Sequence, residues 1–164
     1  KKFMLDIYTS TPLSDKQKAR LCIDGCCALH PPVSYGEIRK LQAQADILVH
    51  AEAFDLKERL ATHQSFSTKI VDYLATNRCI LAIGDKSCAS IDYFVRNSCG
   101  AVALSKDEIT VQLDKLYSDK SLLKYYADKA WDAGKKNHQR SKMQKALYEE
   151  IKKTVGSKNE GITH

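Results

Sequence analysis

The strongest constraint on the fold is an alternation of short apolar runs with longer amphipathic stretches, which continues to about residue 117. This alternation is typical of βαβ units around a parallel sheet. Short runs that are apolar throughout suit strands covered by helices on both faces. We therefore expect an α/β protein, a Rossmann-like doubly wound parallel sheet of about five strands followed by C-terminal helices. The predicted strands are residues 3–8, 26–30, 46–50, 79–83 and 101–104.

Helix starts are marked by capping residues. Ser34 with Glu37, and Ser105 with Glu108, match the capping box, and Ser14 is a further candidate cap. After residue 117 the sequence predicts two closing helices, 121–133 and about 139–153. A chain of 164 residues has the length of one domain. We expect that domain to span residues 1–155, with 156–164 as a polar, flexible tail.

Right-handed crossovers favour the strand order 2-1-3-4-5, with ligands bound beyond the carboxyl ends of the strands. The residues predicted at that edge are 8–12, 30–33, 50–54 and 84–87. One connection, residues 51–64, is longer than the others and is predicted to be irregular. Because long irregular loops in compact domains are often functional, we expect the ligand beside it.

Composition limits the class of protein. The sequence has no apolar run long enough to cross a bilayer and no signal peptide pattern, so we expect a soluble, cytoplasmic protein. The six cysteines contain no C-x-x-C pair and no zinc-finger spacing, which predicts reduced, mostly buried thiols and no bound metal.

The formal charge of +6 indicates affinity for anions, and much of the excess lies near the C-terminus. The basic residues there are Lys129, Lys135, Lys136, Arg140, Lys142, Lys145, Lys152 and Lys153. Two interpretations stay open: a solvated helical face, or an electrostatic contact with anionic lipid at the inner face of a membrane. Weak aromatic interleaving argues against a nucleic-acid partner.

The segment from Gln64 to residue 82 carries the clearest chemistry, because a Ser/Thr cluster opens a helix there and a strand closes the unit. Free amides at a helix start bind anions; Ser67 or Thr68 adds a hydroxyl and Lys69 adds a charge. Asp72 shares the helical face of Thr68 and Lys69, where its carboxylate can accept hydrogen bonds from a ribose diol. The alternative is an ordinary N-cap at Ser67 with solvated neighbours.

This segment resembles the C-terminal domain of retaining GT-B glycosyltransferases, the large family of sucrose synthases and bacterial polysaccharide-building enzymes. The family pattern "A-D-V-x-V", then Glu-x7-Glu, then "A-x-G-x-P-V" is matched by residues 45–49, by Gln64 and Asp72 eight positions apart, and by residues 75–80. The run from Ser67 to Ala75 is similar to the bacterial variant "T-K-hydrophobic-x-E-Y-L-A". The resemblance covers about residues 3–150.

The resemblance implies a nucleoside-diphosphate sugar as substrate, without a cofactor or an obligatory metal. The amides around Ser67 and Thr68, with Lys69, would meet the diphosphate, Asp72 the ribose and Gln64 the donor sugar. The loop from His30 through Pro32 to Val33 would border the base. No residue is assigned to the catalytic step.

Both family glutamates are altered here, to Gln64 and Asp72. The family's domain also begins with one more strand and helix, and an acceptor-binding N-terminal domain precedes it. We therefore expect a fragment that is inactive alone. If the missing strand is the family's central one, its neighbours either close directly into the predicted order or leave a gap. Two alternatives remain: a flavodoxin-like binding module, and a glycosyltransferase-like module without activity. A receiver domain is excluded, because an acidic cluster does not follow the first predicted strand.

Overall fold

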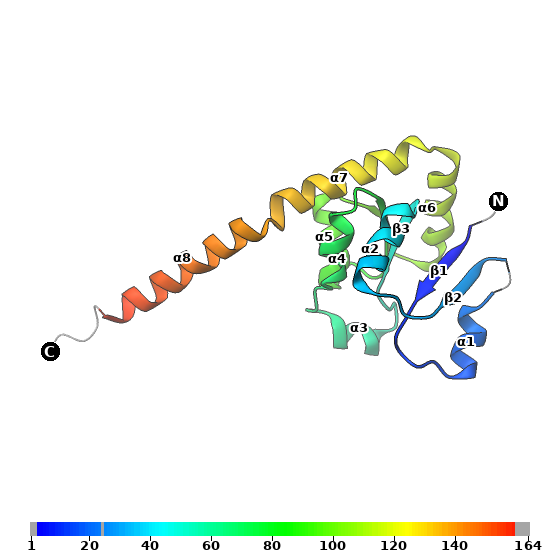
Figure 1. Ribbon diagram of the computed structural model, residues 1–164, viewed down its shortest axis with the longest axis horizontal. Helices are drawn as coiled ribbons and strands as arrows, with labels where there is room; N and C mark the ends of the chain where they lie inside the picture. Colours follow the sequence, from blue (N-terminus) through cyan, green and yellow to red (C-terminus); the bar gives the residue numbers. More distant parts are fainter. Residues whose placement is uncertain (1–2, 24, 160–164) are drawn as a thin grey trace. The chain divides into compact units, whose positions relative to one another are not determined.

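The computed structural model describes residues 3–23 and 25–159 and has the expected α/β architecture of parallel strands and helices (Figure 1). The chain divides into two compact units, Lys1–Leu41 and Gln42–His164. Each unit holds its own parallel sheet, with two strands in the first and three in the second. The two units are therefore described separately.

The first unit is a small sheet with one complete helix. Strand β1 (Leu5–Tyr8) pairs in parallel with β2 (Cys27–His30), and helix α1 (Asp15–Leu21) connects them. Helix α2 (Tyr35–Gln44) begins in this unit. None of its described side chains is fully buried, so the unit has no core of its own.

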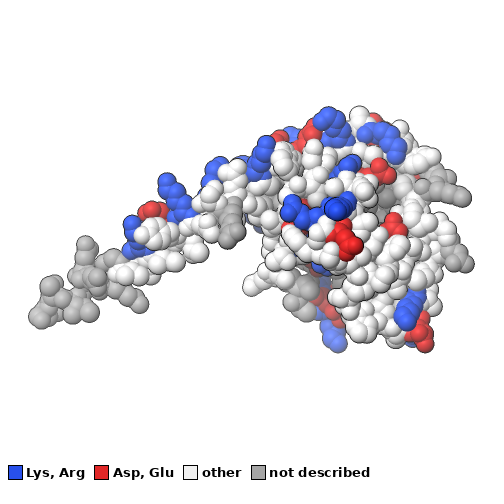
Figure 2. Space-filling view, in the orientation of Figure 1, with Lys and Arg blue, Asp and Glu red and all other residues white. Residues whose placement is uncertain are grey.

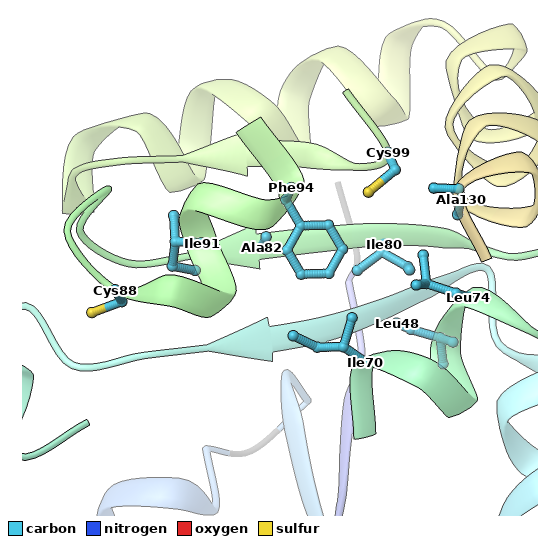
Figure 3. Packing of buried hydrophobic residues seen from close by; sticks show 11 residues of the cluster. Leu48, Ile70, Leu74, Ile80, Ala82, Cys88, Ile91, Phe94, Cys99 and Ala130 are labelled. Atoms are coloured by element: carbon cyan, nitrogen blue, oxygen red, sulfur yellow. The ribbon is translucent and has the colours of Figure 1, made fainter. Parts of the chain in front are cut away.

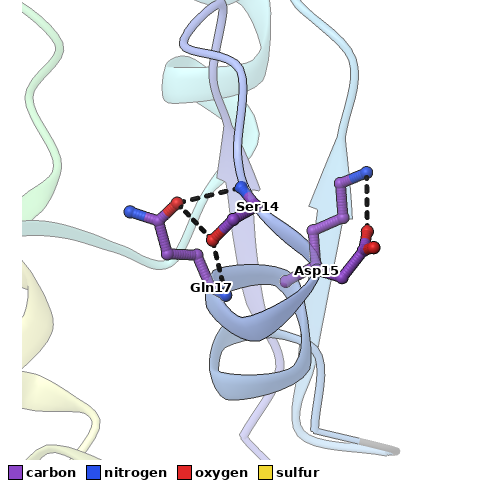
Figure 4. Close-up of polar contacts among 4 residues, drawn as sticks. Ser14, Asp15 and Gln17 are labelled. Carbon is purple, nitrogen blue, oxygen red and sulfur yellow. Dashed lines mark hydrogen bonds and ion pairs between the residues drawn. The ribbon is translucent and has the colours of Figure 1, made fainter.

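The predicted caps are present at three helices, one of them in altered form. At α1, the Ser14 amide donates to Gln17 Oε1 (2.9 Å) and the Gln17 amide donates to Ser14 Oγ (3.4 Å), as Figure 4 shows. Ser34 and Glu37 form the same reciprocal box at α2. At Ser105 only half of the box forms: the Glu108 carboxylate accepts from the Leu104 amide instead of the Ser105 amide.

The second unit contains the larger sheet, in the order β3 (Ile47–Ala51), β4 (Cys79–Ile83), β5 (Ala101–Ala103), all parallel. Its helices are α3 (Leu56–Thr62), α4 (Lys69–Leu74), α5 (Ala89–Asn97), α6 (Lys106–Ser118), α7 (Ser121–Asn137) and α8 (Arg140–Asn159). The β4 strand lies at the centre and is buried over its first four residues. This is the fully apolar type of strand that the sequence predicted.

The core of the second unit lies on both faces of this sheet. On one face Ile70 and Leu74 of α4 pack with Ile80 of β4 and Phe94 of α5 (Figure 3). On the other face Leu116 of α6 packs against the sheet residues Cys79, Leu81 and Ala101. Helix α7 packs on both faces: the beginning of the helix joins the cluster around Leu116, and Ala130 and Ala133 join the cluster around Phe94. Burying both sheet faces in this way supplies most of the hydrophobic stabilisation.

Three expectations need correction. The described strands form two sheets, β1-β2 and β3-β4-β5, in place of the single 2-1-3-4-5 sheet, so that of the two expected alternatives the gap is the one observed. The connection 51–64 is not irregular, because Asp55 caps α3 through the amides of Lys57 and Glu58. The last helix extends to Asn159, into the predicted tail, while residues 160–164 lie outside the described part.

The cysteines divide into two groups. Cys79, Cys88 and Cys99 are buried, as predicted, whereas Cys22 and Cys26 are exposed and Cys27 is half-buried. Burial raises the pKa of both the Cys79 and Cys99 thiols to about 12. All six cysteines are free thiols in the structure.

Candidate functional site

The start of α4 is the centre of the predicted anion site. Thr68 is the N-cap residue, but its side chain makes no capping hydrogen bond. In the described part of the chain, the amides of Thr68 and Lys69 have no hydrogen-bond acceptor, whereas the Ser67 amide donates to Ser90 Oγ (3.3 Å). Two of the three predicted amides are thus available to an anion, and the third is used to anchor the loop.

Side-chain burial along α4 separates a core face from an outer face. Ile70 and Leu74 are buried, Thr68 and Lys69 are exposed, and Asp72 is half-buried. The helix has only six residues, so its macrodipole contributes little to anion binding. An anion held here would depend mainly on the Lys69 charge and the two amides.

Gln64 lies in the turn before this segment, with an exposed side chain. A surface pocket of about 360 Å³ is lined by Leu60, His63, Gln64 and Ser65. Gln64 therefore borders a surface hollow in the loop that leads to Ser67.

The residues predicted to border the base lie in the first unit, at the carboxyl end of β2. The His30 ring stacks on Tyr8 (centroids 4.6 Å apart), and its Nε2 lies 2.7 Å from Asp6 Oδ1. Pro32 and Val33 are exposed. A hollow of about 410 Å³ is lined by Thr9, Ser10, Thr11, Pro12, Leu13, Lys18, Leu29, His30, Pro31 and Pro32.

The structure adds polar residues that the sequence analysis did not select, all at the carboxyl edge of the larger sheet. His50 is 7% exposed, and its Nε2 lies 3.2 Å from Glu52 Oε1. Next to β4, Arg59 forms an ion pair with Asp85, which also accepts from the Ser87 amide. The sequence could have indicated His50, Glu52 and Asp85, because they lie at or just after the ends of predicted strands.

Electrostatics at this edge are set by burial and by neighbouring charges. Burial lowers the pKa of His50; Glu52 opposes this shift and the positive charge of Lys69 adds to it. The hydrogen bonds from Ser87, together with the Arg59 charge, lower the pKa of Asp85. His50 therefore favours its neutral form, and Lys69 lies near enough to influence it.

The basic residues near the C-terminus lie on α7 and α8, where Lys and Arg side chains recur along the surface (Figure 2). Every described side chain from 141 to 155 is exposed. Lysines stack over exposed aromatic rings: Lys135 over Trp131 (4.9 Å) and Lys152 over Tyr148 (4.7 Å). Each of these pairs joins residues four positions apart on one helix. No helix in the described residues is long and apolar enough to cross a membrane.

Solved structures of glycosyltransferases resemble this chain, two of them over about three quarters of its length. One is the C-terminal domain of a group 1 family glycosyl transferase (LpcC) from Francisella tularensis, with a TM-score of 0.55, 19% identity and coverage of 77% of this chain and 60% of that one. The other is WaaG, a glycosyltransferase involved in lipopolysaccharide biosynthesis, with a TM-score of 0.54, 18% identity and coverage of 73% and 30%. The chain has the fold of a GT-B C-terminal domain.

The likeness to these two chains lies in the structure, since the sequence identities are only 19% and 18%. The chain spans 60% or less of the length of these two solved chains. No protein-family model matches it, and no curated protein sequence shows significant similarity to it. At identities below one fifth the resemblance establishes the architecture, and function must be argued from the site.

Proposed function

We propose that this chain is the donor-binding part of a retaining glycosyltransferase that transfers a hexosyl group from a nucleoside-diphosphate sugar to a glycan or lipid-linked acceptor. The observation that carries the proposal is the structural likeness to two glycosyltransferase chains over about three quarters of this chain. The free amides of Thr68 and Lys69 support it, because a donor diphosphate requires donors of this kind at the carboxyl edge of the sheet.

The proposed roles follow the chemistry of each group. Lys69 and the amides of Thr68 and Lys69 bind the diphosphate, and stabilise its negative charge as it leaves. Asp72 accepts hydrogen bonds from the ribose, and Gln64 contacts the donor sugar. The acceptor is bound by a second domain outside this chain, so that catalysis takes place between the two domains and the chain alone is inactive.

Nucleotide binding tests this proposal. The thermal unfolding of the chain is followed with uridine, guanosine and adenosine diphosphates, and we expect one of them to raise the melting temperature. The Lys69→Gln variant should lose about tenfold or more in affinity, because hydrogen bonds to charged groups contribute about 1.5 to 3 kcal/mol. Lys115→Gln, at an exposed position on α6, is the matched control. A chain that responds to none of the three nucleotides contradicts the proposal.

A binding module without activity is the second candidate, and Gln64 favours it because an amide cannot supply the negative charge of a glutamate. In a polypeptide that carries both domains, Gln64→Glu separates the two candidates. Donor hydrolysis that appears only in the variant indicates an inactive module. Hydrolysis or transfer by the unaltered protein indicates an enzyme.

A further inference from the structure

The Glu52 side chain is half-buried and has few polar partners among the described residues. Its side chain is 14% exposed, and its one charged or polar partner among the described residues is His50. A carboxylate offers about four lone-pair positions, and one neighbouring imidazole can occupy only part of them. By contrast, the nearby Asp85 is engaged by both Arg59 and Ser87.

The backbone holds Glu52 firmly in this place. Its amide donates to the Ile83 carbonyl (2.8 Å), which fixes the turn after β3 to the end of β4. Its Cβ packs against Gly84, where an added Cβ would lie only 2.9 Å from it. Gly84 also has a φ of +151°, a conformation that other residues rarely adopt. The close approach of the two residues thus requires a glycine at 84.

The His50 imidazole lies beside the Glu52 carboxyl group. The imidazole is buried against the Phe94 ring (centroids 5.9 Å apart), on the face of β3 that also carries Leu48. Although Nε2 and Oε1 of Glu52 are 3.2 Å apart, they are not aligned for a hydrogen bond, and Nε2 has no other partner in the described chain.

We propose that Glu52 binds hydroxyl groups of the donor's sugar, with His50 as a positioning residue. This inference rests on the proposed function. Glu52 follows a strand at the carboxyl edge, where parallel sheets bind ligands, and the Lys69 charge influences the same histidine. The diphosphate needs cations and amides, whereas a carboxylate suits the neutral polyol attached to it, because sugar hydroxyls donate hydrogen bonds.

The test compares each nucleoside diphosphate with its sugar conjugate. Affinities are measured by calorimetry for uridine diphosphate and UDP-glucose, guanosine diphosphate and GDP-mannose, and adenosine diphosphate and ADP-glucose. For the pair that binds, Glu52→Gln should weaken the sugar conjugate about tenfold and leave the diphosphate within about twofold, since only the conjugate has the hexosyl hydroxyls. Glu149→Gln, an exposed glutamate on α8, should change neither.

His50→Gln should also weaken binding of the sugar conjugate more than binding of the diphosphate, by a smaller factor than Glu52→Gln does. A general loss of stability would weaken both ligands equally. Thermal unfolding of both variants establishes that they fold. Equal losses for both ligands, or no loss for the conjugate, would overturn the role of Glu52 while leaving nucleotide binding intact. A wild-type chain that binds neither member of any pair overturns the proposed function and this inference together.

Discussion

Single residues at the carboxyl edge of the larger sheet are held in unusual environments, and His50 is the clearest case. Its imidazole is 7% exposed, and desolvation lowers its pKa although Glu52 lies beside it. A buried group that resists protonation links folding to pH. The burial of His50 therefore makes the stability of the folded protein depend on pH.

Stability should fall when the pH drops below about 6.5, the ordinary pKa of histidine. The unfolded chain binds a proton at His50 in this range and the folded chain does not, so protonation favours unfolding until the lowered folded-state pKa is reached. Urea unfolding at several pH values measures this slope. The His50→Gln variant should show a shallower slope between pH 7 and 5, and an unchanged slope would contradict the assignment to His50.

Gly84 should not tolerate a side chain. The added Cβ of Gly84→Ala would lie 2.9 Å from Glu52 Cβ and 3.0 Å from Ile91 Cγ1, at a φ of +151°. Overpacking and backbone strain each contribute about 1 to 3 kcal/mol, so we expect a loss of about 2 kcal/mol or more in chemical unfolding. Gly36→Ala is the control. Gly36 lies in helix α2 and an added Cβ there has no neighbour within 4 Å, so this variant should be neutral or slightly more stable.

At the scale of elements, the strands were predictable to within about two residues, because buried parallel strands are short apolar runs. Helix α3 was missed although Asp55 and Glu58 mark its start, since seven residues are too few for a clear period. The sequence left open whether the strands form one sheet or leave a gap, because strand pairing depends on contacts between residues that lie far apart in the chain. The contact of His50 with Glu52 depends likewise on the turn after β3.

Helix α8 should contribute little to the stability of the second unit. Its described side chains are all exposed, including Leu147, Ile151 and Val155, so it buries no core residue. Truncation after His138 should therefore leave the melting temperature of the unit almost unchanged. Loss of cooperative unfolding in the truncated chain would show that α8 packs against the sheet domain.

At the scale of the whole molecule, the charge of +6 is concentrated on the last two helices, next to exposed aromatic and apolar side chains. This combination suits peripheral contact with an anionic membrane surface, where a nearby Lys contributes about 1 kcal/mol. We expect binding to phosphatidylglycerol vesicles that weakens as salt is added. Replacing Lys142, Lys145, Lys152 and Lys153 by glutamine should abolish it, and equal binding to neutral phosphatidylcholine vesicles would contradict the electrostatic account.

The central claim, a nucleotide diphosphate held at the start of α4, is tested most directly by a nuclear magnetic resonance titration of the labelled chain. Among the described residues the amides of Thr68 and Lys69 have no hydrogen-bond acceptor, whereas the Ser67 amide donates to Ser90 Oγ. Adding the diphosphate that binds should shift the Thr68 and Lys69 amide resonances most strongly. Shifts confined to other parts of the chain, or none with any of the three nucleotides, would contradict the account.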